Sequence, residues 1–236
     1  MNATKVCAAS LLLTMLGAVS GAAFAAGAGQ VQHLSGTLSV QRPDGSVRIL
    51  SQKSDVSAGE VLTTQKDSYA QINFSDGSSM TMRPNTQMKL ESYQFLQDKP
   101  QEDSAFFRLI KGGLRTVTGL VGKRGNQDAY RIGTSTATIG IRGSSGETLD
   151  CTQGCAGVVP GGEKADKAVY HNTLTGSYIM QSEDGTVVIG EGQFAAHKKG
   201  QPPTILKDDP GFKLNELPFL IGQGPKGTNA DNCVVK

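Results

Sequence analysis

Three Asp-Gly dipeptides, each set between alternating apolar and polar residues, constrain the fold of this 236-residue chain more than any other feature. They are Asp44-Gly45, Asp76-Gly77 and Asp184-Gly185. Asp-Gly between alternating runs is a strong hairpin signal, because Gly adopts the positive φ that a tight turn requires. Recurrent hairpins predict an all-β protein, built as a β-sandwich, a roll or a solenoid-like stack.

The composition agrees with an all-β chain. Hydrophobic residues make up 37% and charged residues 19%, which excludes a disordered chain and a coiled coil. Apolar residues between positions 106 and 121 recur at helical spacing, but Gly112 and Gly113 lie among them. Each Gly would cost a helix about 1 kcal/mol, so we expect strands in this segment as well.

The first 25 residues have the three parts of a secretory signal peptide. Lys5 precedes an uncharged apolar run over residues 6–19, and Ala23-Phe24-Ala25 follows as a cleavage site. The apolar run is too short to favour the alternative, a membrane anchor. We therefore expect cleavage after Ala25, a flexible linker over residues 26–34, and a periplasmic or secreted protein without a transmembrane anchor in its mature form.

Three cysteines remain after the predicted cleavage: Cys151, Cys155 and Cys233. An oxidising compartment favours disulfides, and the short spacing of Cys151 and Cys155 suits a local bridge. A pairing of Cys233 is the second choice. The three histidines are scattered along the chain, unlike the paired ligands of zinc sites. We expect neither a metal site nor a cofactor.

The chain resembles the FecR domain family, named after the periplasmic sensor part of an iron-dicitrate regulator. The resemblance runs through residues 36–40, 56–64, 70–82 (with Asp76 and Gly77), 88–90 and 109–115. Its most specific part is a signature over residues 134–144, which departs from the family pattern at Ser135 and Ser144. The core of the signature is Thr136, Ala137, Thr138, Ile139, Gly140, Ile141, Arg142 and Gly143.

This resemblance implies an all-β, non-catalytic module outside the cytoplasm. It assigns residues 35–145 to the FecR domain, and residues 146–199 to a cysteine-containing loop and a trailing hairpin of the same domain. Residues 200–236 form a Pro-rich tail. Anti-sigma members carry a sigma-binding segment and a membrane helix ahead of the domain. This chain has a cleavable signal there, so we expect a stand-alone exported protein without direct control of a sigma factor.

Basic residues stand out between positions 106 and 143. Arg142 could bind a carboxylate or phosphate through its planar donor fork. A structural role is favoured, because the apolar residues that alternate with it indicate a core strand. Lys123 and Arg124 are the candidate partner surface, and we expect the fold to keep its stability when both are neutralised. The protein as a whole is nearly neutral, with a formal net charge of +2, and it shows no aromatic stacking platform, so nucleic-acid binding is not expected.

Two functions remain. The first is an exported module that binds an envelope protein or glycan, in signalling or scaffolding. The alternative is a carbohydrate-active or peptidoglycan-cleaving enzyme on a β-scaffold, which needs two facing carboxylates. The chain lacks the serine-elbow, zinc-protease and P-loop motifs, so we expect no enzyme. The Gly-rich segment over residues 150–175 is expected to tolerate shortening.

Overall fold

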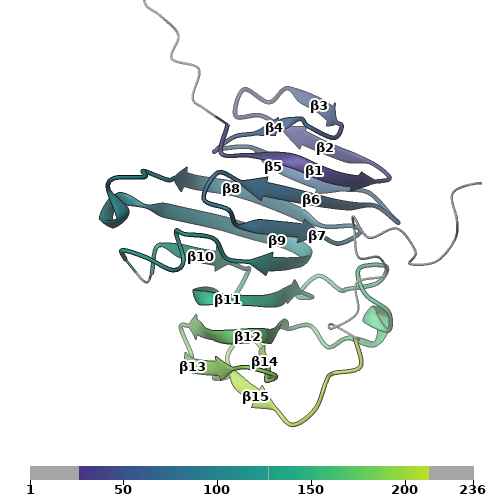
Figure 1. Ribbon diagram of the computed structural model, residues 1–236. Helices are drawn as coiled ribbons and strands as arrows, with labels where there is room; N and C mark the ends of the chain where they lie inside the picture. The colour runs from purple at the N-terminus through teal and green to yellow at the C-terminus, as the bar shows by residue number, and fades with distance from the viewer. Residues whose placement is uncertain (1–26, 127, 213–236) are drawn as a thin grey trace, which may run out of the picture.

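The computed structural model describes residues 27–126 and 128–212 of the chain. Fifteen strands form one hydrogen-bonded sheet, and two short 3-10 helices are the only helices in these residues. The strands follow one another down the molecule nearly in chain order, from β3 at one end to β15 at the other (Figure 1). The all-β prediction is therefore confirmed.

The first half of the chain contributes β1 (Gly29–Ser35), β2 (Leu38–Gln41), β3 (Val47–Leu50), β4 (Asp55–Val56), β5 (Val61–Thr64), β6 (Tyr69–Phe74), β7 (Ser79–Met82), β8 (Gln87–Gln94), η1 (Pro100–Glu102) and β9 (Ser104–Val117). The second half contributes β10 (Tyr130–Gly133), β11 (Thr138–Asp150), η2 (Gly162–Lys164), β12 (Val169–Ser182), β13 (Gly185–Gly190), β14 (Phe194–His197) and β15 (Thr204–Leu206).

The sheet branches at its long strands and thereby folds into two layers. Residues 104–111 of β9 pair with β8, whereas residues 114–117 pair with β7. Strand β12 divides in the same way, because residues 169–172 pair with β14 and residues 177–182 pair with β13. Each long strand therefore begins in one layer and ends in the other.

The core lies between the two layers. Phe74 of β6 stacks on Tyr93 of β8 with ring centroids 5.4 Å apart, and its ring lies 5.1 Å from Phe107 of β9. Strands β6 and β8 are not hydrogen-bonded to each other, so these rings meet across the gap between layers. One continuous cluster of buried apolar side chains, from Ala28 to Ala195, fills this gap.

The chain turns between layers at a repeated corner. Gly36, Gly112 and Gly176 have φ values of 81°, 92° and 74°, and each is followed by a residue whose N–H donates to a hydroxyl of a neighbouring segment. The accepting hydroxyls belong to Ser68, Thr86 and Ser144, with N···O distances of 2.9, 2.9 and 3.0 Å. Each hydroxyl in turn donates to the carbonyl two residues before it. A Cβ on Gly176 would lie 2.7 Å from the Ser144 hydroxyl oxygen, so the corner accepts only glycine without rearrangement.

The three predicted hairpins are present as β2–β3, β6–β7 and β12–β13. Gly45 and Gly77 hold left-handed turn positions with φ values of 84° and 81°, whereas Gly185 has a φ of 149° and opens β13. The strands expected between residues 106 and 121 are also confirmed, since β9 extends to Val117.

Two expectations about the connecting segments differ from the structure. The segment expected to be a linker forms β1, which pairs with β4 and β6 and buries Val31. The segment expected to tolerate shortening contains the first half of β12 and most of a second cluster of buried side chains, so trimming it removes core. The described part of the Pro-rich tail contributes β15 and buries Phe212.

The predicted signal peptide and most of the Pro-rich tail lie outside the described residues. In the part of the chain that the structure describes, no helix is long and apolar enough to cross a membrane.

Candidate functional site

The signature identified in the sequence forms the beginning of β11 and the turn before it. Ile139 and Ile141 point into the core and are fully buried, whereas Thr138, Gly140 and Arg142 alternate with them and belong to the outer face. The side chain of Ile179 in β12 packs against Gly140. A Cβ on Gly140 would lie 2.7 Å from a methyl carbon of Ile179, so there is no room for a side chain at this position. The signature therefore presents one face to the core and another to the outside.

A cavity of about 660 Å³ opens at the start of the signature strand, and we name it the signature cavity. Arg131, Thr134, Ser135, Thr136, Ala137, Thr138, Gln181, Ser182, Glu183, Asp184, His197 and Lys199 line it. Four strands contribute, since Arg131, Thr138, Gln181 and His197 belong to β10, β11, β12 and β14. Hydroxyls predominate, and the amide of Gln181, two cations and the two carboxylates of Glu183 and Asp184 complete the polar lining. Such groups bind the polar surface of a peptide or a saccharide.

His197 is the one histidine in this lining, and it is 1% exposed. Its Nε2 lies 3.2 Å from an oxygen of Asp184, and its Nδ1 lies 2.9 Å from the hydroxyl oxygen of Thr136. A carboxylate accepts only, so Nε2 carries the hydrogen and Nδ1 accepts from the Thr136 hydroxyl. Asp184 also accepts the N–H of Gly200 at 2.9 Å. These bonds fasten β14 and the β12–β13 turn to the start of the signature strand.

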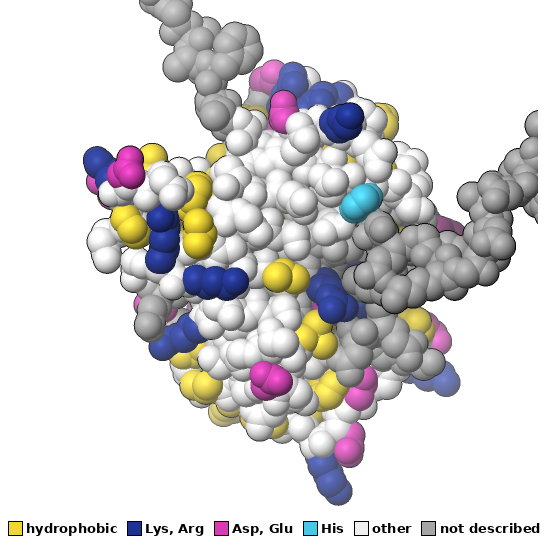
Figure 2. Space-filling view, viewed as in Figure 1, with side chains coloured by type: hydrophobic (Ala, Val, Ile, Leu, Met, Phe, Trp, Pro, Cys, Tyr) yellow, Lys and Arg dark blue, Asp and Glu magenta, His cyan; other side chains and the backbone are white. Residues whose placement is uncertain are grey.

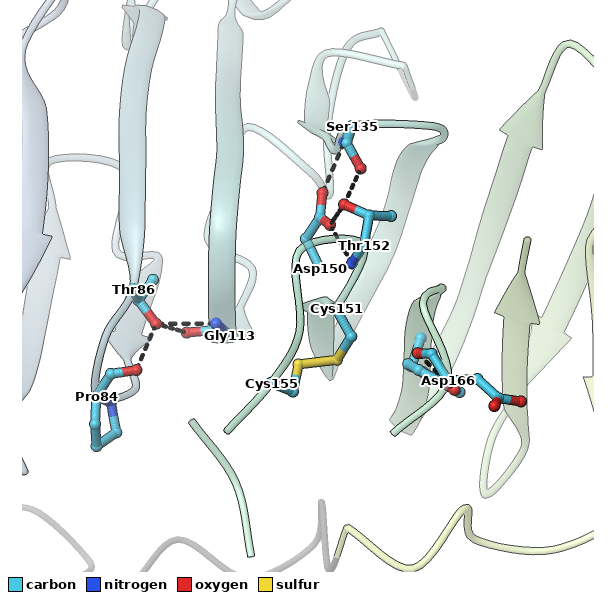
Figure 3. The surroundings of a disulfide bond; sticks show 10 residues. Pro84, Thr86, Gly113, Ser135, Asp150, Cys151, Thr152, Cys155 and Asp166 are labelled. Atoms are coloured by element: carbon cyan, nitrogen blue, oxygen red, sulfur yellow. Dashed lines mark hydrogen bonds between the residues drawn. A yellow bond between two sulfur atoms is a disulfide. The ribbon is translucent and has the colours of Figure 1, made fainter. Parts of the chain in front are cut away.

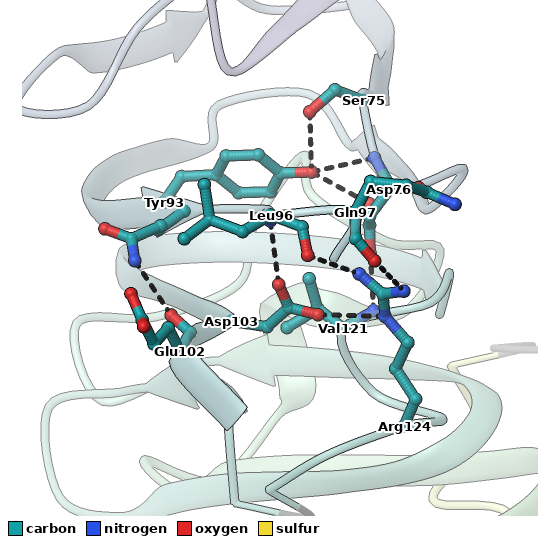
Figure 4. A network of polar contacts seen from close by, with 10 residues as sticks. Ser75, Asp76, Tyr93, Leu96, Gln97, Glu102, Asp103, Val121 and Arg124 are labelled. Atoms are coloured by element: carbon teal, nitrogen blue, oxygen red, sulfur yellow. Dashed lines mark hydrogen bonds and ion pairs between the residues drawn. The ribbon is translucent and has the colours of Figure 1, made fainter. Parts of the chain in front are cut away.

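Asp76, the acid of the second Asp-Gly turn, is a buried structural centre (Figure 4). Its carboxylate accepts the N–H and hydroxyl of Ser78 at 3.0 and 2.6 Å, the Tyr93 hydroxyl at 3.0 Å and the N–H of Val121 at 3.1 Å. Its backbone carbonyl accepts the N–H of Leu120. Asp76 thus joins the β6–β7 turn to the loop that follows β9, which is the loop that carries Lys123 and Arg124.

Arg124, one of the two residues of the candidate partner surface, is held by contacts within the protein. Its Nε lies 3.1 Å from a carboxylate oxygen of Asp103, and its terminal nitrogens donate to the carbonyls of Gln97 and Leu96 (Figure 4). Its guanidinium also covers the ring of Phe95 at 4.8 Å. Neutralising Arg124 would leave the fully buried Asp103 side chain without its cation, so the fold would lose stability.

Other basic residues of the same segment are also paired. Arg108 lies 2.8 Å from Glu91, and Arg115 lies 3.7 Å from Glu147. The face seen in Figure 2 carries basic and acidic side chains scattered among neutral ones, with small mixed groups at its upper and left edges. The segment is therefore mostly a structural and solvated face.

Lys123 and Arg142 lie together, although nineteen positions separate them. A cavity of about 310 Å³, which we name the corner cavity, is lined by Gly122, Lys123, Arg124, Gly125, Arg142 and Gly143. The fold thus brings the end of the signature to the candidate partner surface. Neither segment carries a local sequence signal for the other, so their proximity could not be predicted from the sequence.

Cys151 and Cys155 are joined by a disulfide, as their spacing predicts (Figure 3). Both are fully buried in the second cluster, with Leu149, Val158 and Ala168 among its members. Asp150 accepts the N–H of Ser135 at 2.8 Å and bonds to Thr152, so the disulfide loop also supports the turn that begins the signature. Cys233 lies outside the described residues.

A group of buried polar side chains lies farther along β11 and β12. Glu147 pairs with Arg83 at 2.5 Å, and both side chains are 0% exposed. Burial raises the pKa of Glu147, and Arg83 and Arg115 oppose this rise. His171 is fully buried, its Nδ1 lies 3.0 Å from the Thr148 hydroxyl, and its ring centroid is 4.2 Å from that of Tyr178. Burial lowers the pKa of His171 to about 3, so this imidazole stays neutral.

Residues 60–159 match the family model described as FecR protein. This stretch of the chain is a FecR domain. The match contains the corner cavity, the disulfide and the signature strand, whereas His197 and the β12–β13 turn lie beyond it.

Two crystal structures of a candidate anti-sigma factor from Parabacteroides distasonis resemble the chain, at 11% and 10% sequence identity. Each has a TM-score of 0.45 and is matched over 63% of this chain. This chain spans 60% of the length of those structures. The search of curated proteins gave no match.

Proposed function

We propose that this protein is a non-catalytic binding module of the cell envelope, which holds a protein or glycan partner on the outer face of its signature strand. The FecR domain over residues 60–159 supports a binding role, because the family resemblance implies an all-β module without catalysis. Signalling and scaffolding are both compatible with such a module.

The observation that carries this proposal is the division of the signature into two faces. Its isoleucines complete the core, while Thr136 and Thr138 line the signature cavity, which has the size of a ligand site. Packing alone does not explain why this strand places hydroxyls in a cavity of about 660 Å³. The hydrogen bond from Thr136 to His197 also fixes the wall of this cavity. The cavity suits a partner that offers backbone amides or sugar hydroxyls.

The proposed location is the periplasm or the cell exterior. The amino-terminal sequence supports export, and the paired cysteines suit an oxidising compartment. A fusion of the first 35 residues to alkaline phosphatase, which is active only after export, tests this point. Activity that requires residues 1–25 is the expected result, and an inactive, intact fusion would contradict it.

The binding role is tested with the mature protein carrying Arg131→Gln and Thr138→Val together. Both side chains lie in the signature cavity, and neither is part of the core. We expect the variant to keep its melting temperature and to lose most of its retention on purified peptidoglycan or its cross-linking to one envelope protein. Thr63→Val, on the outer face of the distant β5, is the matched control.

Unchanged retention of the double variant would refute the assignment of this face. The same preparations test the enzymatic alternative, which requires an acid in the cavity. Release of reducing ends by the wild type, abolished by Glu183→Gln with the fold intact, would favour an enzyme over a binding module.

A further inference from the structure

The corner cavity collects positive charge from two distant parts of the chain. Among its six lining residues, three are basic, three are glycines and none is acidic. Lys123 comes from the loop after β9, and Arg142 comes from the end of the signature, where β11 turns from one layer to the other. Both side chains are exposed, so the charge is open to solvent.

The position of the glycines keeps this cavity open. Gly143 has a φ of 66°, and a Cβ on it would lie 3.5 Å from Cγ of Lys123. The two segments are therefore in contact, and the absence of a side chain at Gly143 leaves the cavity unfilled. Gly125, with a φ of 65°, allows the loop to turn back at the other wall.

The three cations differ in how they are held. Arg124 is fixed by Asp103 and by two backbone carbonyls, so its charge is already compensated and it forms a rigid wall. Lys123 has no acidic partner within ion-pair distance among residues 27–126 and 128–212. Lys123 and Arg142 both place positive charge at the cavity, and its lining contains no acid.

We infer that the corner cavity binds the oxyanion group, phosphate or carboxylate, of an envelope saccharide. Two cations beside each other repel, and an oxyanion between them removes the repulsion and accepts their hydrogen bonds. A volume of about 310 Å³ admits one charged sugar unit and not a folded peptide or a helix. This inference rests on the proposed binding function and names the chemical class of one of its ligands.

The test is a nuclear magnetic resonance titration of the ¹⁵N-labelled mature protein with three probes. Glucose 6-phosphate and glucuronate carry the two oxyanions on a sugar, and glucose carries neither. We expect at least one of the two anions to shift the amide signals of Gly122, Gly125 and Gly143, and glucose to shift none of them. The anion that binds more tightly identifies the source, and inorganic phosphate as a fourth probe shows whether the sugar contributes.

Three variants connect this binding to the cavity. Lys123→Gln and Arg142→Gln should each weaken binding of the preferred anion by at least fivefold, and the double variant should abolish it. Lys66→Gln, an exposed cation far along the sheet on the β5–β6 turn, is the matched control and should bind like the wild type. The melting temperature of each variant confirms that it is folded.

Two results would overturn the inference: no response to either anion, or equal binding by the wild type and the double variant. Retention on the envelope partner is measured with the same double variant. If the wild type binds neither anion but is still retained on the envelope partner, only the oxyanion inference fails. If the Arg131→Gln and Thr138→Val protein also keeps its retention, the proposed function fails with it.

Discussion

His171 should make the protein less stable as the pH falls, and the structure sets the size of this effect. Its ring is buried between Thr148 and Tyr178, and burial lowers its pKa to about 3 from an ordinary value of 6.5. Below pH 6.5 the unfolded chain takes up a proton that the native protein does not. The unfolded state is therefore favoured progressively as the pH falls toward 3, and above about pH 7.5 the contribution of His171 is constant.

The expected magnitude follows from the two pKa values. Each pH unit well below 6.5 lowers the free energy of unfolding by about 1.4 kcal/mol, so the loss between pH 7.5 and pH 5 is about 2 kcal/mol. Urea unfolding at several pH values measures it, in the wild type and in His171→Gln. The difference between the two proteins isolates His171, because every other titrating group, including the buried Glu147, is present in both.

Thr148→Val is the matched control for this experiment. It removes the hydroxyl that bonds to His171 and keeps the histidine, so it should lower stability by about 1 kcal/mol while the pH dependence remains. If the difference between wild type and His171→Gln is flat from pH 7.5 to pH 5, His171 is accessible to protons in the native state. The reasoning from burial would then be refuted.

Four further predictions concern the corners, the turns and the disulfide. Gly176→Ala should lower the free energy of unfolding by about 1–3 kcal/mol more than the control Gly192→Ala. Gly192 also has a positive φ, but a Cβ on it would meet no atom within 4 Å, so equal losses would show that the corner tolerates a side chain. Asp76→Asn should cost about 2 kcal/mol, because the buried carboxylate accepts from Ser78, Tyr93 and Val121; an unchanged urea midpoint would contradict this. Arg124→Gln should lower the melting temperature and Lys123→Gln should not, and the reverse order would show that Lys123 is the structural cation. Cys151 and Cys155 should remain unmodified when the non-reduced protein is alkylated and its intact mass is measured, and two modified thiols would exclude the disulfide. Replacing both cysteines by Ala should lower the free energy of unfolding by about 2 kcal/mol, as expected for so short a loop.

The hairpins were predictable because their signals are local. An Asp-Gly dipeptide and the alternation on each side of it lie within one short stretch, and the Gly112-Gly113 pair was enough to exclude a helix in β9. Strand β1 was missed because it has no such local signal. It fully buries only Val31, so it has no alternation to detect, and its pairing with β4 and β6 is what makes it a strand.

The parts of the site that were missed depend on contacts between distant residues. His197 follows Thr136 by 61 positions, and only the fold brings the two together. The corner has a faint local signal that could have been used. A residue that tolerates positive φ precedes each accepting hydroxyl: Asp67 before Ser68, Asn85 before Thr86, and Gly143 before Ser144. A residue with a positive φ followed by Ser or Thr, opposite a glycine with a positive φ, is therefore the sequence pattern of a corner.

The passage of the long strands from one layer to the other has a consequence for local unfolding. Strands β3, β4, β13 and β15 each have one hydrogen-bonded neighbour, so they can fray at little cost. Strands β9, β11 and β12 belong to both layers, and opening either layer there breaks the other. Amide hydrogens of these three strands should exchange with solvent only when the whole molecule opens. The signature strand is one of the three, so the wall that it contributes to both cavities is held rigid before any ligand arrives. Binding against this wall loses little conformational entropy.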